Sequence, residues 1–340
     1  MGSHVDFQDG LVLPMALAQE TRVGVKSTGG PRVRLKSDRF DGSVDVAADG
    51  SDGPDGGISG WGRYAAAVVW ALARRGRPPA GLEGVVTSTV PPRAGLSSSA
   101  ALEVAIAHAL MKSASWALPA LDVARACWEA EVEGAGVPVG IMDPAVSCLG
   151  SPRGALLIDC KSLSIRDVGI PGHLRVVVID SGAQRVLADG RYASRRADVE
   201  AGVRRLGIAS LREAALDAVA SLPDPERRRC RHVVTEIARV AAFADALTSD
   251  DTAVMGETMR ASYRSDVEDY EAGHPQVDAL VARLEGWAGV VGARMSGGGF
   301  GGVVVALVEA DRAAAIVDDV APLLAFVAQP SPGAGVVVTG

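Results

Sequence analysis

The sequence has little cysteine, and its cysteines are not arranged in pairs. The four thiols stand far apart in the chain, and none belongs to a CxxC motif. Closely paired or regularly spaced cysteines would indicate a metal site or a disulfide framework. We therefore expect a reduced, cytoplasmic protein with buried thiols.

Long hydrophobic runs, a secretory signal and a basic tract are absent as well. Glycine, proline or charge interrupts each apolar run well before the ~18 residues that a membrane span needs, so none is expected. The formal net charge is −7, which argues against a nucleic-acid partner. The remaining composition, 48% hydrophobic and 22% charged over 340 residues, suits a globular enzyme of one large domain or two ordinary ones.

Strand-like and helix-like segments are mixed along the chain and fall into two halves that meet near residue 172. The β-branched run at 174–180 predicts a strand, and residues 336–339 predict a closing strand. The Gly- and Asp-rich stretch 41–60 predicts a surface loop. We expect an N-terminal domain of residues 1–172, completed by a closing strand within 329–340, and a C-terminal domain of residues 173–328.

The stretch PPRAGLSSSAA at 91–101 follows a predicted strand and opens a predicted helix. A helix N-terminus attracts anions through its unpaired N–H groups and its dipole. Ser97, Ser98 and Ser99 add donors and an oxygen that can ligate a metal. The loop contains no lysine, so a phosphate here would be held by backbone and hydroxyls. The alternative is a helix cap with small residues for tight packing, and the loop taken alone favours that alternative.

A second loop, RMSGGGFGG at 294–302, places five glycines around one phenylalanine. Glycines in such density cost folding stability, and an ordinary turn needs only one or two. We therefore expect the backbone to approach another segment or a ligand closely here. A β-bulge with a hairpin turn is the alternative.

The glycine-containing stretch EVEGAGVPVGIMD at 131–143 begins with Glu131 and ends with Asp143. Asp143 lies at the edge of an apolar stretch, where it is either an ordinary helix cap or a general base or charge beside a phosphoryl acceptor. Glu131 lies just before the glycines, and alone it would be interpreted as a solvated helix end.

Taken together, these motifs resemble the galactokinase branch of the GHMP kinase superfamily, over nearly the whole chain. The matching segments, in order, are GSHVDFQDGLVLPMAL, SGWGRY, VPPRAGLSSSAALEVA, GAGVPVGIMD, SYRSDVEDYEAGHPQVDALV and GARMSGGGFGG. The first is similar to the family's sugar-binding motif GEHTDYxxGxVLPMAL. The resemblance implies a two-domain α+β fold, with an N-terminal ribosomal-S5-like domain and a C-terminal ferredoxin-like domain. It places ATP and sugar in the cleft between them.

The resemblance also implies roles for individual residues of an ATP- and Mg²⁺-dependent kinase that acts on a sugar's anomeric hydroxyl. Asp143 is the expected catalytic residue, as base or as electrostatic partner, and Ser99 and Glu131 are the expected metal ligands. The expected ATP-binding residues are Trp61, Arg93, Ala94, Gly95, Leu96, Ser97, Ser98, Ser99 and Ala100. The expected sugar-binding residues are Ser3, His4, Asp6, Gly140, Asp143, Arg185 and Tyr192. The expected floor of the cleft is formed by Gly297, Gly298, Gly299 and Gly301.

The sequence departs from the family pattern mainly on the sugar side. Ser3 stands where the family has a glutamate that contacts the C6 end of the sugar, Arg185 replaces a histidine, and Arg93 replaces a glycine. The family's catalytic arginine, within APGR, would fall a few residues before Met1. A late start, a trimmed chain or an impaired enzyme would each account for that, and the shortened first strand favours a late start.

These departures give the expected substrate. Losing an anion at Ser3 and gaining a cation at Arg185 favour a sugar that is extended or phosphorylated at C6. The first alternative is an ordinary galactose 1-kinase, and the second is a non-catalytic sugar and ATP sensor. We expect a small-molecule sugar or sugar phosphate as partner, and a monomer or a homodimer.

Overall fold

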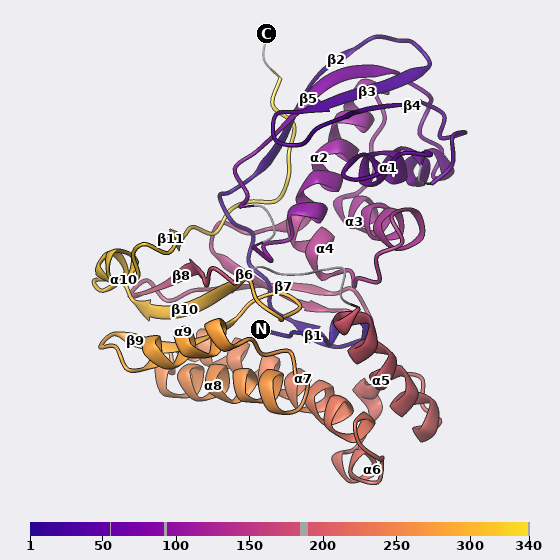
Figure 1. Ribbon diagram of the computed structural model, residues 1–340. Coiled ribbons are helices and arrows are strands. Elements are labelled where there is room, and N and C mark those ends of the chain that lie inside the picture. The colour runs from indigo at the N-terminus through magenta and orange to yellow at the C-terminus, as the bar shows by residue number, and fades with distance from the viewer. Residues whose placement is uncertain (55, 92–93, 184–189, 339–340) are drawn as a thin grey trace. The chain divides into compact units, whose positions relative to one another are not determined.

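The computed structural model of the chain describes residues 1–54, 56–91, 94–183 and 190–338 (Figure 1). These residues pack into two compact units, each assembled from separate stretches of chain. Unit 1 comprises Met1–Met15, Pro92–Leu96 and Ser151–Ser331, and unit 2 comprises Ala16–Pro91, Ser97–Gly150 and Pro332–Gly340. Both units combine helices with sheet, as the mixed sequence pattern predicts. None of the described helices is long and apolar enough to cross a membrane.

Unit 2 is built on a four-stranded sheet in the order β2-β5-β3-β4, in which only β3 and β5 run parallel. Its strands are β2 (Thr21–Ser27), β3 (Arg32–Ser37), β4 (Ser43–Ala47) and β5 (Leu82–Ser88). Its helices are α1 (Gly62–Arg74), α2 (Ser98–Ser113), α3 (Ala120–Glu129), the π-helical turn η2 (Ala130–Gly134) and α4 (Met142–Leu149). The helices α1 and α2 pack on the sheet and on each other (Figure 1).

Unit 1 contains two antiparallel sheets. The larger has the order β11-β8-β10-β9 and the smaller the order β1-β6-β7. The strands are β1 (Leu11–Val12), β6 (Gly154–Asp159), β7 (Ile165–Gly169), β8 (Leu174–Asp180), β9 (Val290–Met295), β10 (Val303–Glu309) and β11 (Ala325–Ala328). The predicted β-branched strand at 174–180 is thus β8, at the centre of the larger sheet.

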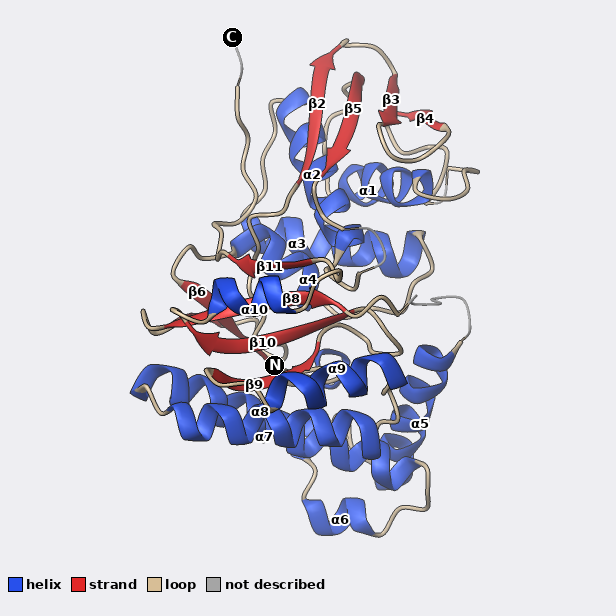
Figure 2. Ribbon diagram, turned by 60° about the vertical axis from the view of Figure 1, so that its left-hand side comes forward, coloured by secondary structure: helices blue, strands red, loops and turns tan. Residues whose placement is uncertain are grey.

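Helices make up the rest of unit 1 (Figure 2). They are η1 (Asp6–Gln8), α5 (Arg191–Leu206), η4 (Leu211–Glu213), α6 (Leu216–Ala220), α7 (Glu226–Ser249), α8 (Thr252–Glu268), α9 (Pro275–Glu285) and α10 (Ala313–Asp319). The long helices α7 and α8 lie side by side, and α8 and α9 pack on β9. The side chain of Asp251 caps α8 by accepting a hydrogen bond from the Val254 N–H at 3.0 Å, which supplies a partner for a donor that the helix start leaves unpaired.

The apolar core of unit 1 joins its two sheets to α7 and α8. Val240 and Phe243 of α7 and Met255 of α8 are buried together with Leu174 of β8 and Val168 of β7. Burial of such side chains is the main driving force that holds these elements together. The N-terminal segment belongs to this unit because β1 pairs with β6 and packs on α7.

The boundary between the two units therefore does not lie near residue 172. Residues 1–15 and 151–172, which we expected in the N-terminal domain, pack with the C-terminal half. The physical reason is that β1, β6 and β7 form one sheet, and α7 lies against β1 and β7.

Two expectations about secondary structure were wrong, namely a loop throughout 41–60 and a closing strand at 336–339. The stretch 41–60 contains β4, because Val44 and Val46 alternate with exposed Asp45 and pair with β3. Residues 336–338 form no strand in the part of the chain that the structure describes, and Val337 is 88% exposed. The preceding residues instead run along the end of α4, where the Gly333 N–H donates to the Gly150 carbonyl at 3.0 Å.

The second glycine loop approaches other backbone closely, as its composition predicts. A Cβ atom placed on Gly299 would lie 2.6 Å from the Ala272 carbonyl oxygen, and one on Gly302 would lie 2.9 Å from the Ala94 carbonyl oxygen. Both glycines also have positive φ, at 77° and 91°. A larger residue would therefore meet both a steric and a conformational obstacle.

We expect Gly299→Ala to lower the free energy of unfolding by about 2–4 kcal/mol, because it adds overpacking to the cost of a left-handed alanine. Gly207→Ala is the matched control, since Gly207 has φ 65° in the same unit and a Cβ atom added there would meet no atom within 4 Å. That change should cost only about 1 kcal/mol. Denaturant unfolding of the two variants tests this, and equal losses would contradict the steric argument.

Candidate active site

The serine loop within 91–101 opens α2, as the sequence predicts. The helix begins at Ser98, Ser97 before it has a left-handed φ of 56°, and Gly95 has φ 78°. No side chain caps the helix start, so the first N–H groups of α2 have no side-chain acceptor. Ala94, Gly95 and Leu96 belong to unit 1, and Ser97 to Ala100 belong to unit 2. Arg93 lies outside the described residues.

A cluster of acids lies next to this helix start in unit 2. Glu131 of η2 is only 3% exposed, and Glu103 of α2 is fully buried. The Ser99 side chain lies close enough to Glu131 to affect its pKa. The pKa of Glu131 is raised to about 7: burial is the largest cause and Asp143 adds to it, while the Ser99 and Glu103 side chains oppose the rise.

Glu103 was missed by the sequence analysis, since it stands within an apolar helical pattern and looks like a core position. Burial raises the pKa of Glu103 well above its usual range, and the neighbouring Glu131 adds to that rise. Two carboxylates in a dry environment cannot both ionise at low cost, so a proton on Glu103 stabilises an ionised Glu131.

Asp143, the expected catalytic residue, lies in the first turn of α4 and is close enough to Glu131 to affect its pKa. Tyr64 of α1 lies near the same acids. Burial raises its pKa, and the charges of Glu131 and Glu103 raise it further. Ser99, Glu131 and Asp143 are therefore brought together in unit 2. Gly140 lies in the same unit shortly before α4, and Trp61 lies just before α1, where its indole N–H donates to the Asp41 carbonyl at 3.3 Å.

The donor set fits a hard divalent cation. Ser99 and Glu131 present a hydroxyl and a carboxylate, and neither Glu103 oxygen has a hydrogen-bond partner within the described residues. No group of three or more His, Cys, Asp or Glu side chains in that part of the chain is arranged as a metal cage. A cage is not what Mg²⁺ with a nucleotide requires, since it is held by one or two protein oxygens, phosphates and water.

The sugar motif supplies a separate group of expected site residues, which lies in unit 1. His4 is 5% exposed, has a left-handed φ of 63°, and stacks on Tyr270 with ring centroids 3.9 Å apart. Tyr192 of α5 lies against the same histidine, with centroids 5.7 Å apart. Asp6 opens η1 and accepts a hydrogen bond from the Phe7 N–H at 3.0 Å. His4 and Tyr192 thus lie against each other and Asp6 stands two residues after His4, whereas Arg185 lies outside the described residues.

The two residues before His4 are tied to buried polar side chains. The Gly2 N–H donates to Glu236 at 2.9 Å, His232 Nε2 lies 3.1 Å from the Ser3 carbonyl oxygen, and Arg294 donates to Ser3 Oγ at 2.8 Å. Burial opposes ionisation of Glu236, but Arg294, Arg239 and His232 lower its pKa to about 2. The sequence analysis missed Glu236, His232, Arg294 and Tyr270, although two of them lie within segments that carry the family resemblance.

The glycine loop at 297–301 also belongs to unit 1. Phe300 within it is buried, has φ 61°, and lies under the Arg191 guanidinium, 4.6 Å from the ring centroid. Its N–H donates to the Ala272 carbonyl at 2.8 Å. The loop is therefore anchored beside Tyr270, the residue that stacks on His4.

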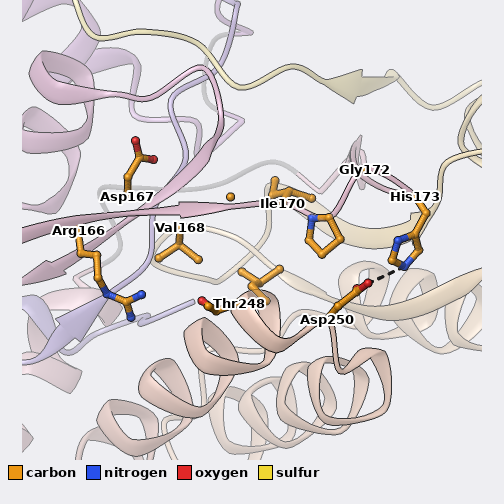
Figure 3. A pocket seen from close by; sticks show the side chains of 11 residues that line it. Arg166, Asp167, Val168, Ile170, Gly172, His173, Thr248 and Asp250 are labelled. Atoms are coloured by element: carbon orange, nitrogen blue, oxygen red, sulfur yellow. Dashed lines mark ion pairs between the residues drawn. The ribbon is translucent and has the colours of Figure 1, made fainter.

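A pocket of about 510 Å³ in unit 1 is separate from these groups (Figure 3). It is lined by residues 166–173 together with Leu247, Thr248 and Asp250, and His173 and Asp250 form an ion pair of 3.5 Å at one end. None of these residues is among the expected site residues. The pocket therefore adds nothing to the expected site, which stays a prediction.

Comparison with known proteins decides the family. Residues 63–151 match the GHMP kinases N terminal domain and residues 243–322 match the GHMP kinases C terminal domain. A galactokinase of Mycobacterium tuberculosis (strain ATCC 25618 / H37Rv) is 39% identical over 327 residues, which cover 94% of this chain and 89% of the relative. The chain belongs to the galactokinase branch of the GHMP kinases.

Solved structures agree with this assignment. A crystal structure of Lactococcus lactis galactokinase complexed with galactose matches this GHMP kinase with a TM-score of 0.91 and 27% identity, over 98% of this chain and 91% of that one. A mevalonate kinase matches with a TM-score of 0.70 at 16% identity, which shows the fold alone. The expected two-domain α+β fold and the expected class, an ATP-dependent sugar kinase, are confirmed.

The expectation of a sugar extended or phosphorylated at C6 was wrong. A relative that is 39% identical over 94% of this kinase is a galactokinase, and a galactokinase structure that matches with a TM-score of 0.91 was solved with galactose. The local reason is visible at Ser3, because its hydroxyl accepts a hydrogen bond from Arg294 rather than leaving an open space. Arg185, the other residue behind that expectation, lies outside the described residues.

Glu131→Gln should stabilise the metal-free kinase at pH 8 by up to about 3 kcal/mol. The pKa of Glu131 is raised from its ordinary value of 4.5 to about 7 by folding. Stability from the protonated form is present below pH 4.5 and is lost as pH rises through 7, so glutamine avoids the loss. Thermal unfolding in EDTA at about pH 8 and about pH 4.5 tests this: the gain should vanish at the lower pH, and a variant that is less stable at the higher pH would contradict it.

Proposed function

We propose that this kinase transfers the γ-phosphoryl group of ATP to the anomeric hydroxyl of D-galactose. The observation that carries the proposal is the 39% identity to galactokinases over 94% of the chain. The two groups of residues described above support it, since unit 2 offers acids and hydroxyls at a helix start and unit 1 offers a hydrogen-bonding aromatic segment.

The phosphate side uses the start of α2. Backbone N–H groups of the loop and the hydroxyls of Ser97 and Ser98 donate to phosphate oxygens, where the helix dipole also favours negative charge. Ser99 and Glu131 hold Mg²⁺, which when bound neutralises charge on the phosphates. Trp61 and residues 93–100 are the proposed ATP contacts.

Asp143 acts on the sugar hydroxyl that attacks. An ionised carboxylate there takes the hydroxyl proton or stabilises the partial positive charge on it, and either role lowers the barrier to attack on the γ-phosphorus. The position of Asp143 in the first turn of α4 suits this role, because the positive end of a helix dipole favours a negatively charged side chain.

The sugar side is the segment that begins at Ser3. His4 is fixed by its stack on Tyr270, so its imidazole is offered to a sugar hydroxyl in one orientation. Asp6, Gly140 and Tyr192 supply the remaining polar contacts. Phosphoryl transfer mostly needs such positioning together with charge neutralisation.

Asp143→Asn tests the proposal against the alternative of a non-catalytic sensor. With ATP, Mg²⁺ and galactose, the wild type should form galactose 1-phosphate, and the variant should lose roughly 100-fold or more in kcat with little change in Tm. A coupled assay for ADP release, with product position assigned by phosphorus NMR, measures the activity, and a thermal melt measures Tm. Absence of turnover in the wild type, together with tight binding of galactose and ATP, would favour the sensor instead.

Tyr192→Phe should raise KM for galactose about 3- to 10-fold, because it removes one hydroxyl from the sugar contacts and nothing from the ATP side. Tyr263→Phe is a matched control, since that hydroxyl donates to Asp278 instead of facing His4. The control should keep KM for galactose unchanged. An unchanged KM in Tyr192→Phe, or a rise in KM for ATP of the same size, would remove Tyr192 from the sugar site.

A further inference from the structure

A buried ionic cluster lies behind the sugar segment in unit 1. Arg294 of β9 is 4% exposed, and Glu236 of α7 and Asp266 of α8 are fully buried. Arg294 Nη2 lies 2.5 Å from Asp266 Oδ2, and Arg294 Nη1 lies 3.8 Å from Glu236 Oε1. Arg239 closes the cluster, with its Nε 2.7 Å from Glu236 Oε2.

Ser3 is the point at which the cluster reaches the sugar segment. The same Nη2 atom of Arg294 that pairs with Asp266 also donates to Ser3 Oγ at 2.8 Å. His232 connects both sides, since its Nε2 lies 3.1 Å from the Ser3 carbonyl oxygen and 3.5 Å from Asp266 Oδ1. The orientation of His4, the next residue, therefore depends on where Arg294 is held.

The guanidinium and carboxyl groups of this cluster match in number, and the buried Met1 amino group beside them has its pKa lowered to about 5, mainly by burial. Two guanidinium groups, of Arg294 and Arg239, face two carboxylates, of Glu236 and Asp266. Buried charges are tolerated only when they are compensated and hydrogen-bonded, and removing one partner costs far more than an exposed pair contributes. A glutamate at residue 3, which the family motif has there, would put a third carboxylate beside Arg294.

We propose that Asp266 provides at Arg294 the compensating charge that a glutamate at residue 3 would provide there, and so acts as a positioning residue for the sugar segment. Asp266 is fully buried, so it acts through Arg294 and Ser3 rather than by touching the substrate. Its effect on galactose binding rests on the proposed function. A negative charge at either residue 3 or residue 266 would then compensate Arg294. The effects of substitutions at the two positions are therefore energetically coupled.

A double-mutant cycle tests this with Ser3→Glu, Asp266→Asn and the double variant, each followed by Tm and by KM for galactose and for ATP. Ser3→Glu adds an uncompensated acid and Asp266→Asn removes a compensating one. Each single variant should lower Tm by roughly 6 °C or more and raise KM for galactose on the order of tenfold. The double variant restores the charge balance and should recover at least half of both losses, with KM for ATP unchanged throughout.

Glu257→Gln is the matched control, because Glu257 is an exposed acid on the same helix. Its effects should be small and additive with those of Ser3→Glu. Additive losses in the Ser3→Glu/Asp266→Asn pair, or a Ser3→Glu variant with wild-type Tm, would overturn the proposal. If the wild type fails to phosphorylate galactose, the proposed function fails, and the Tm cycle still decides whether the two positions share one charge.

Discussion

The buried guanidinium of Arg294 is the constraint on which unit 1 depends. It joins β9 to α8 through Asp266, approaches Glu236 of α7, and reaches the N-terminal segment at Ser3. A cation that is 4% exposed can stay charged only because acids surround it. The elements that supply these acids must therefore pack together, and the sugar motif is held by the same interactions that stabilise the core.

Two buried glutamates, one in each unit, show opposite electrostatics. Glu236 is surrounded by cations and its pKa falls to about 2, whereas Glu131 lies beside other acids and its pKa rises to about 7. The first arrangement suits a structural anchor, because the charge is already compensated within the chain. The second suits a cation ligand, because its compensation has to come from what binds there. A buried glutamate thus suits a structural role where cations surround it, and a ligand-binding role where other acids surround it.

The sequence predicted well what depends on local order. The helix that follows the serine loop and the strand β8 both follow from the residue pattern near them. The motif resemblance correctly indicated the family, and it located Ser99, Glu131 and Asp143, which the structure brings together. The strand β4 was missed because glycines and acids on both sides of SVDVA conceal its short alternation of buried and exposed residues. What depends on distant pairing could not be predicted: Ser3 was interpreted as lost volume and lost charge, because nothing near it in sequence reveals that a guanidinium 291 residues away already bonds to its hydroxyl.

The separation of these partners has a consequence for biosynthesis. The Gly2 N–H bonds to a side chain 234 residues further on, the Ser3 carbonyl contacts one 229 residues further on, and Ser3 Oγ accepts its hydrogen bond from β9. Because a chain is made from its N-terminus, the sugar segment is synthesised well before the residues that hold it. Contacts of such long range form slowly, so this segment reaches its final conformation only after its distant partners have been made.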